Sequence, residues 1–178
     1  MTKKRAAEAD SKIVGAVPYG NETEFEEYLR RLIEDRITKV VPSVYALRNK
    51  KAVDIVICKD KPKPELFFLE VKFHQKKNGR LGFGGGAGRG FQPEILSKHP
   101  AYFEENLRWI LASDDHEPSK VLFVPSATVR KYVAGKKVDE KYNNIQKRIF
   151  REERWLDADT LVQKLRSWLG VSGPRQET

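Results

Sequence analysis

The chain of 178 residues carries a formal net charge of +9, with 39% hydrophobic and 33% charged residues. This length suits one domain with a proper core, and no apolar run approaches the ~18 residues that span a bilayer. The positive charge favours an anionic partner, and among such partners nucleic acid is more usual than an anionic membrane surface.

Residues 1–20 are basic, hold few apolar side chains and show no period, so they are predicted to be a flexible segment. They contain no apolar stretch typical of a secretory signal. The single cysteine, Cys58, cannot form an internal disulfide, and the cytoplasm is the simplest compartment. Residues 21–170 are predicted to form a single domain, and residues 171–178 a disordered tail.

The first predicted helix covers residues 22–36 and begins after Asn21, a favourable N-cap residue. Its apolar residues recur at helical spacing and predict a buried stripe. Four glutamates crowd its first turns, and complementation of the helix dipole explains most of them. A strand is predicted at 39–47, where Pro42 favours an edge position or a bulge.

Residues 52–73 read as two apolar strands joined by a lysine-rich turn at 59–64. Side chains alternate between the two faces of a strand. In the second strand, one face is therefore wholly apolar, whereas Glu70 and Lys72 share the other face with Phe68 and His74. Asp54 lies within the first strand, so charged groups occupy positions where apolar residues would be expected.

Seven of the twelve glycines fall between residues 74 and 90, and the segment 76–91 is predicted to be a flexible loop. It lacks the Gly-Lys-Ser/Thr ending of a P-loop and fits GxGxxG poorly, so no nucleotide cofactor is expected. Residues 120–151 hold nine basic residues against two acidic ones. The predicted DNA contacts in these two regions are Lys76, Lys77, Arg80, Arg89, Arg130, Lys131, Lys136 and Lys137.

Beyond the glycine-rich loop, residues 92–112 are predicted to form one helix or two, and residues 121–124 a buried strand. Trp109 is expected to be a core or edge aromatic. The basic C-terminal part, 126–170, is predicted to be largely helical, with helices at 139–153 and 158–169 and a stop at Gly170. The order of elements predicts an α/β fold with a mixed central sheet flanked by helices.

Hydrolysis of a phosphodiester needs an activated water and groups that offset the growing negative charge, and a cation held by carboxylates serves both needs. Asp54, Glu70 and the Val71 carbonyl are predicted to hold Mg²⁺, with Mn²⁺ as a substitute. Lys72, on the face of Glu70, is placed to orient the water and stabilise the phosphate. The structural alternative is an ion pair of Lys72 with either acid across the strands.

Asp54, fifteen intervening residues and then Glu70-Val71-Lys72 resemble the D…ExK signature of the PD-(D/E)XK nuclease superfamily. The resemblance covers roughly residues 21–125 and implies that family's αβββαβ core, as in small type II restriction endonucleases. It implies metal-binding roles for Asp54 and Glu70 and a water-assisting role for Lys72. A glutamate of the first helix often joins such sites, which suggests Glu24, with Glu27 as the alternative. The proline that names the motif is absent, since Val53 precedes Asp54.

The expected function is therefore Mg²⁺-dependent cleavage of double-stranded DNA, with sequence specificity of the type II restriction kind. Cutting both strands needs two sites, so a homodimer is expected. Two alternatives remain open. One is a structure-selective nuclease such as a Holliday-junction resolvase. The other is a DNA-binding module that does not cut, in which the acidic residues are structural. His74 could reach the site but more often such a residue is a polar strand end.

Overall fold

The structure is a computed structural model and describes residues 19–48, 53–78, 81–82, 99–117, 119–134 and 144–171. The predicted N-terminal segment (apart from residues 19–20), most of the glycine-rich loop and, apart from Val171, the predicted C-terminal tail lie outside these ranges. So do the predicted DNA contacts Arg80, Arg89, Lys136 and Lys137.

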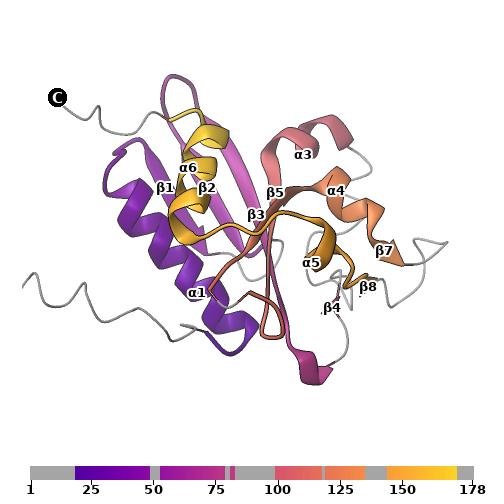
Figure 1. Ribbon diagram of the computed structural model, residues 1–178. Helices are drawn as coiled ribbons and strands as arrows, with labels where there is room; N and C mark the ends of the chain where they lie inside the picture. The colour runs from indigo at the N-terminus through magenta and orange to yellow at the C-terminus, as the bar shows by residue number, and fades with distance from the viewer. Residues whose placement is uncertain are drawn as a thin grey trace, which may run out of the picture.

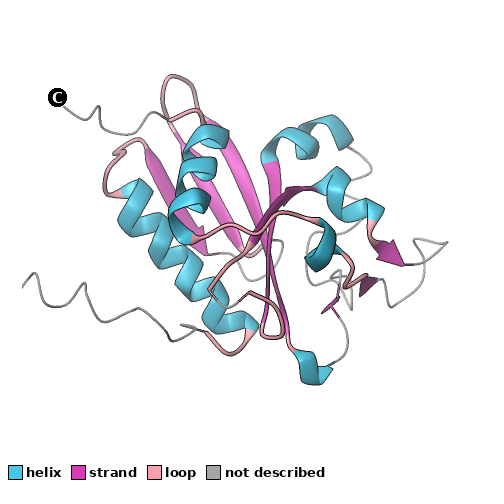
Figure 2. Cartoon of the chain, in the orientation of Figure 1, coloured by secondary structure: helices cyan, strands magenta, loops and turns pink. Residues whose placement is uncertain are grey.

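A mixed sheet of five strands forms the centre of the fold, which confirms the predicted α/β class (Figures 1 and 2). The strands lie in the order β1-β2-β3-β5-β6, and only β3 and β5 run parallel. Their bounds are Val44–Arg48, Ile55–Lys59, Glu65–His74, Leu107–Ser113 and Leu122–Pro125. A small second sheet joins β4 (Leu81–Gly82), β8 (Asn144–Ile145) and β7 (Val133–Ala134).

One face of the central sheet is covered by α1 (Glu22–Ile33), its π-helical continuation η1 (Glu34–Thr38) and α6 (Ala158–Leu169). Phe25, Leu29 and Ile33 form the buried stripe of α1, as predicted from their spacing. α6 has the predicted bounds: Asp157 caps its start, and Gly170 ends it with a φ of 63°. These helices pack on the side chains of Ile57, Leu69, Ile110 and their neighbours.

The opposite face of the sheet carries the shorter helices α3 (Pro100–Asn106), α4 (Ser126–Lys131) and α5 (Ile149–Glu152). Trp109 is only 1% exposed and donates a hydrogen bond from Nε1 to Ser126 Oγ at 3.2 Å. It is thus a core residue, as predicted. Within the described ranges, no helix combines the length and apolar character needed to cross a membrane.

Several predicted elements are wrong in type or extent. Residues 107–112 belong to strand β5 and not to a helix, because this run is buried on both sides between β3 and β6, where apolar periodicity cannot separate strand from helix. The described part of the predicted helix 139–153 holds only β8 and the short α5. The first helix ends at Ile33 before η1, and β1 begins at Val44. In the predicted loop, Lys76–Asn78 form a 3₁₀ turn (η2) and β4 follows.

Candidate active site

The candidate site forms where β3 extends beyond its neighbour β2. The last pair between them is Ile55 with Leu69, so residues 70–74 pair only with β5 on their other side. Two carboxylates take the place of the missing strand. Asp54 Oδ2 accepts a hydrogen bond from the Val71 N–H at 2.6 Å, and Glu22 Oε2 accepts one from the Phe73 N–H at 3.3 Å. The acids are thus fixed by backbone groups of the central strand.

Lys72 lies at the centre of these acids. Its Nζ is 3.1 Å from Glu70 Oε1, 3.3 Å from Glu22 Oε1 and 3.7 Å from Asp54 Oδ2. The ammonium also donates a hydrogen bond to the Val71 carbonyl at 2.8 Å. The structure therefore brings together the predicted Asp54, Glu70, Val71 and Lys72. The cross-strand ion pair that was the structural alternative is also present, so the two interpretations share one geometry.

The cluster carries more negative than positive charge. Three carboxylates and one ammonium sum to −2 when all are ionised. The Glu70 side chain is only 2% exposed, and its Oε2 has no hydrogen-bond partner among the described residues. Burying an ionised oxygen without a partner is costly. The cluster is thus short of one strong positive partner.

The pKa values follow from this imbalance. Burial raises the pKa of Glu70 to about 7; the attraction of Lys72 opposes this rise and the charge of Asp54 adds to it. Burial likewise raises the pKa of Asp54, against the effects of Lys72 and the Val71 N–H. For Lys72, burial alone would lower the pKa, but the surrounding carboxylates outweigh it and raise the pKa instead. Lys72 therefore stays a cation, while Glu70 is easily protonated.

The helix glutamate that reaches the cluster is Glu22, and the prediction of Glu24 needs correction. Glu24 turns back to accept a hydrogen bond from the Gly20 N–H at 2.7 Å, and its own N–H donates to the N-cap Asn21. Glu27 binds Arg30 and Arg31, and these hydrogen bonds lower its pKa to about 2. The capping box could have indicated this. The side chain of the third residue after an N-cap usually accepts a hydrogen bond from a backbone N–H at the helix start. Here that residue is Glu24, so Glu22, the first residue after the N-cap, is left to reach the cluster.

The described DNA-contact candidates lie on the surface. Lys76 and Lys77 are exposed in η2, immediately beyond the end of the Lys72 strand. Lys131 is exposed at the end of α4. Arg130 is also exposed, but its guanidinium forms an ion pair with Glu104 at 2.7 Å. Lys76 and Lys77 are therefore the described basic residues best placed beside the cluster.

The cluster has the donors that a hard dication requires. Asp54 and Glu70 supply carboxylate oxygens, and the Val71 carbonyl supplies a third oxygen beside them. Mg²⁺ prefers such ligands and keeps several of its waters. The net charge of the cluster and the unpartnered Glu70 oxygen are both features that a bound dication would compensate. The residues present thus fit a site for a divalent cation.

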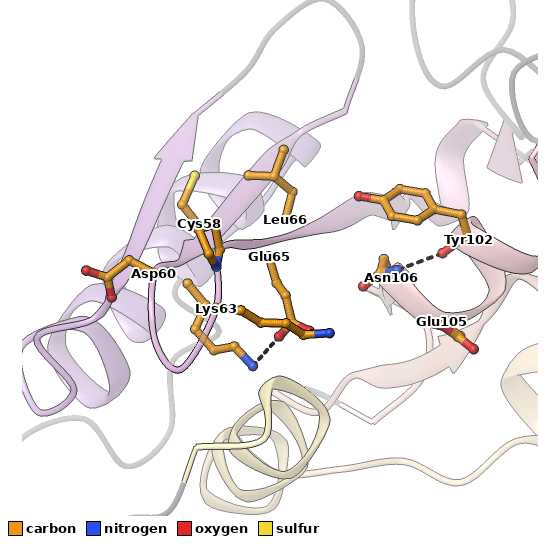
Figure 3. Close-up of a pocket in the computed structure, with 10 residues that line it drawn as sticks. Cys58, Asp60, Lys63, Glu65, Leu66, Tyr102, Glu105 and Asn106 are labelled. Atoms are coloured by element: carbon orange, nitrogen blue, oxygen red, sulfur yellow. Dashed lines mark hydrogen bonds and ion pairs between the residues drawn. The ribbon is translucent and has the colours of Figure 1, made fainter.

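A hollow of ≈ 680 Å³ lies at the opposite end of β3, beside the turn between β2 and β3 (Figure 3). Lys63 and Glu65 on its wall form an ion pair at 3.5 Å, and Lys59 also pairs with Glu65. None of the four cluster residues lines it. Both lysines of its lining are thus paired with Glu65, and no charged group of the cluster faces it, so we place the candidate active site at the cluster.

No protein-family model matches the chain, and a search of curated proteins finds no match to it.

Proposed function

We propose that this protein is a Mg²⁺-dependent DNA endonuclease of the PD-(D/E)XK type. The observation that carries the proposal is the convergence of Asp54, Glu70, Lys72 and Glu22 on the unpaired edge of β3. Leaving aside β4, which belongs to the small second sheet, the order α1, β1, β2, β3, α3 and β5 supports the same core. The net charge of +9 supports a polyanionic substrate.

In this mechanism, Asp54, Glu70 and the Val71 carbonyl would hold the metal. When bound, Mg²⁺ would lower the pKa of an attacking water and offset charge on the phosphate and leaving oxygen. Lys72 would release its contact with the Val71 carbonyl and direct its ammonium at the water and the scissile phosphate. Glu22 would keep Lys72 charged and hold it at the strand edge. In the metal-free protein Glu70 must lose its proton to bind the metal, so the affinity for Mg²⁺ should fall as the pH drops below about 7.

The substrate side of the proposal uses the surface next to the cluster. Lys76 and Lys77 are exposed directly after β3, where they would contact backbone phosphates on either side of the cut. The described part of one chain holds one such cluster, which cuts one strand at a time. Cleavage of both strands of a duplex therefore requires two copies, which a homodimer with two-fold symmetry supplies.

The test is cleavage of a supercoiled plasmid with Mg²⁺ and with EDTA. Lys72→Ala and Glu70→Gln should each lower the cleavage rate by at least about 100-fold, because the first removes the ammonium that acts on the phosphate and the second removes a carboxylate that would hold the metal. DNA binding, measured by fluorescence anisotropy in Ca²⁺, should stay close to wild type. If Lys72→Ala cuts as fast as wild type, the proposed role of Lys72 is wrong.

Two glutamates of α1 offer a matched control. Glu22→Gln should slow cleavage by about tenfold or more, since it removes an acid that holds Lys72, whereas Glu24→Gln should cut normally. Equal rates for the two variants would contradict the assignment of Glu22.

The choice of substrate separates the alternatives. Discrete plasmid fragments would indicate a restriction-type enzyme, and cleavage of four-way junctions alone would indicate a resolvase. If the wild-type protein binds DNA but cuts neither substrate with Mg²⁺ or Mn²⁺, the proposed nuclease function fails.

A further inference from the structure

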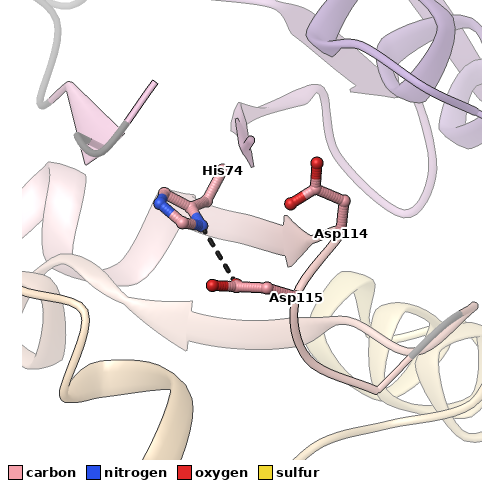
Figure 4. Close-up of side chains that lie close together, drawn as sticks. All are labelled: His74, Asp114 and Asp115. Atoms are coloured by element: carbon pink, nitrogen blue, oxygen red, sulfur yellow. Dashed lines mark ion pairs between the residues drawn. The ribbon is translucent and has the colours of Figure 1, made fainter. Parts of the chain in front are cut away.

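A second group of possible metal ligands lies at the far end of the same strand (Figure 4). His74 is the last residue of β3, and Ser113, its partner across the parallel pair, is the last residue of β5. Asp114 and Asp115 follow directly. One ligand atom from each of His74, Asp114 and Asp115 can be chosen so that all three lie within 4.8 Å of one another. The ends of two central strands therefore position these groups.

The contacts within this group leave it rich in acceptors. His74 Nδ1 lies 2.9 Å from Ser113 Oγ and 3.3 Å from Asp115 Oδ1. The single proton of the Ser113 hydroxyl goes to Asp115 Oδ1 at 2.6 Å, and Asp114 Oδ1 accepts from the Lys76 N–H at 2.7 Å. Because the Ser113 proton goes to Asp115, His74 Nδ1–H donates to Ser113 Oγ in the metal-free protein, and the buried Nε2 has no partner among the described residues. The Ser113 hydroxyl and the Lys76 N–H are then the described donors that reach the two carboxylates, and an ion at Nδ1 would move the ring proton to Nε2. A cation would satisfy the remaining lone pairs.

His74 is the observation that separates this group from an ordinary acidic turn. Its side chain is fully buried, its Nδ1 edge faces Asp115, and the ring of Phe150 packs beside it with centroids 5.8 Å apart. Burial lowers the pKa of His74, with the charge of Lys147 acting in the same direction. A solvated acidic turn does not need a buried imidazole at its base.

We propose that His74, Asp114 and Asp115 bind a divalent transition-metal ion such as Zn²⁺ or Mn²⁺. One imidazole nitrogen and two carboxylates form a donor set that suits these ions better than Mg²⁺, which favours oxygen ligands alone. The bound ion would fasten the end of β3, the strand of Lys72, to the end of β5. It shares no residue with the Asp54 cluster, and this proposal does not depend on nuclease activity.

Two other cationic or ionisable groups face this site and set its affinity. Lys147 lies close enough to lower the pKa values of His74 and Asp115. His116 Nε2 is 3.8 Å from Asp115 Oδ1. Lys147 therefore competes with a bound ion through its charge. Replacing it by alanine should strengthen metal binding several-fold.

The test uses Mn²⁺ as the probe and pulsed electron paramagnetic resonance as the readout. An imidazole ligand gives ¹⁴N coupling to Mn²⁺, whereas a site of carboxylate and carbonyl oxygens gives none. The wild-type protein should show this coupling at one equivalent of Mn²⁺ or at saturation. It should persist in Glu70→Gln, whose change lies in the other cluster, and should disappear in His74→Ala. Wild-type protein without ¹⁴N coupling would overturn the proposal.

Matched variants keep the test informative if His74→Ala does not fold. Asp115→Asn and Asp114→Asn alter exposed residues, and each should weaken the nitrogen-coupled Mn²⁺ by more than about tenfold. The chain has three histidines, and His99 is not one of the proposed ligands, so His99→Ala serves as the control that should retain the coupling. Loss of coupling in His99→Ala but not in His74→Ala would show adventitious binding and refute the site.

The outcomes also separate this proposal from the nuclease. Nitrogen-coupled Mn²⁺ in a protein that cuts no DNA would support the His74 site and remove the proposed function. DNA cleavage by a protein that binds Mn²⁺ without nitrogen coupling would do the reverse.

Discussion

Replacing Glu70 by glutamine should make the metal-free protein more stable at neutral and alkaline pH while abolishing its proposed activity. Glu70 is buried, shares one lysine with two other acids and has an oxygen without a partner in the described structure. Its pKa is raised from 4.5 to about 7, chiefly by burial. The folded protein therefore binds a proton on Glu70 in a pH range where the unfolded chain does not. Its free energy of unfolding falls as the pH rises through this range.

The size of this effect follows from the pKa. The difference between 4.5 and about 7, at ~1.4 kcal/mol for each pH unit, corresponds to about 3 kcal/mol when Glu70 is fully ionised. That value already contains the attraction of Lys72, which helps to set the pKa. Relative to the protein with Glu70 fully protonated, wild type at about pH 8 should have lost nearly all of these ~3 kcal/mol of unfolding free energy. At about pH 5 the loss should be only about 1 kcal/mol. Glu70→Asp, which keeps a carboxyl group at this position, should retain a pH dependence of the same sign.

Urea unfolding in EDTA at several pH values measures this directly. Between about pH 5 and pH 8 the stability of Glu70→Gln relative to wild type should rise by about 2 kcal/mol, or about 4–8 °C in Tm. Glu27→Gln is the control: arginines lower the pKa of Glu27 to about 2, so it is ionised throughout this range, and the variant should be less stable than wild type by an amount that does not change with pH. If Glu70→Gln gains no stability relative to wild type as the pH rises, the charge of ionised Glu70 is already offset by its neighbours in the metal-free protein. The inference that the cluster lacks a cation would then be wrong.

Two further substitutions test the strand edge and a helix end. Asp54→Asn keeps an oxygen that can accept from the Val71 N–H, so it should fold normally but not cut DNA, whereas Asp54→Ala should also lose about 1–3 kcal/mol in urea unfolding. A normal stability for Asp54→Ala would show that water replaces the carboxylate there. Gly170→Ala should lower the free energy of unfolding by about 1 kcal/mol, because a φ of 63° is unfavourable for a residue with a Cβ. The loss comes from the backbone and not from a clash, since the nearest atom to an added Cβ, Lys59 Nζ, lies at an ordinary 3.8 Å. An unchanged Tm would contradict this.

The fold could be predicted from the sequence where one face of an element is apolar and the other polar. α1 and α6 each show such a pattern together with a capping residue, and both begin at the predicted residues. β5 could not be predicted, because its residues are buried on both faces and its identity depends on pairing with β3 and β6. The short β8 depends similarly on pairing with β7 and with β4, which is distant in sequence. Such tertiary pairing leaves no local periodic signal.

The candidate site was predictable where charge interrupts an apolar strand. Asp54, Glu70 and Lys72 stand out in this way, and the structure brings them together. Glu22 could not be chosen among the four glutamates by charge alone, since the choice depends on which of them the helix start already uses. The group around His74 was missed because Asp114 and Asp115 lie about 40 residues away in sequence and meet it only through the parallel pairing of β3 with β5.

The length of β3 is what gives both clusters their chemistry. A strand of ten residues beside a five-residue neighbour leaves several N–H groups without a strand partner, and these must be satisfied by other acceptors. Asp54 and Glu22 fill this need as carboxylates, so negative charge is brought to the edge by the demands of the sheet itself. Lys72 and Glu70 lie on the same stretch, and His74 ends it where β5 also ends. The requirement for backbone hydrogen bonds therefore gathers acids at a rigid, partly open strand edge. A bound cation there would offset the negative charge that the side chains of the protein leave uncompensated.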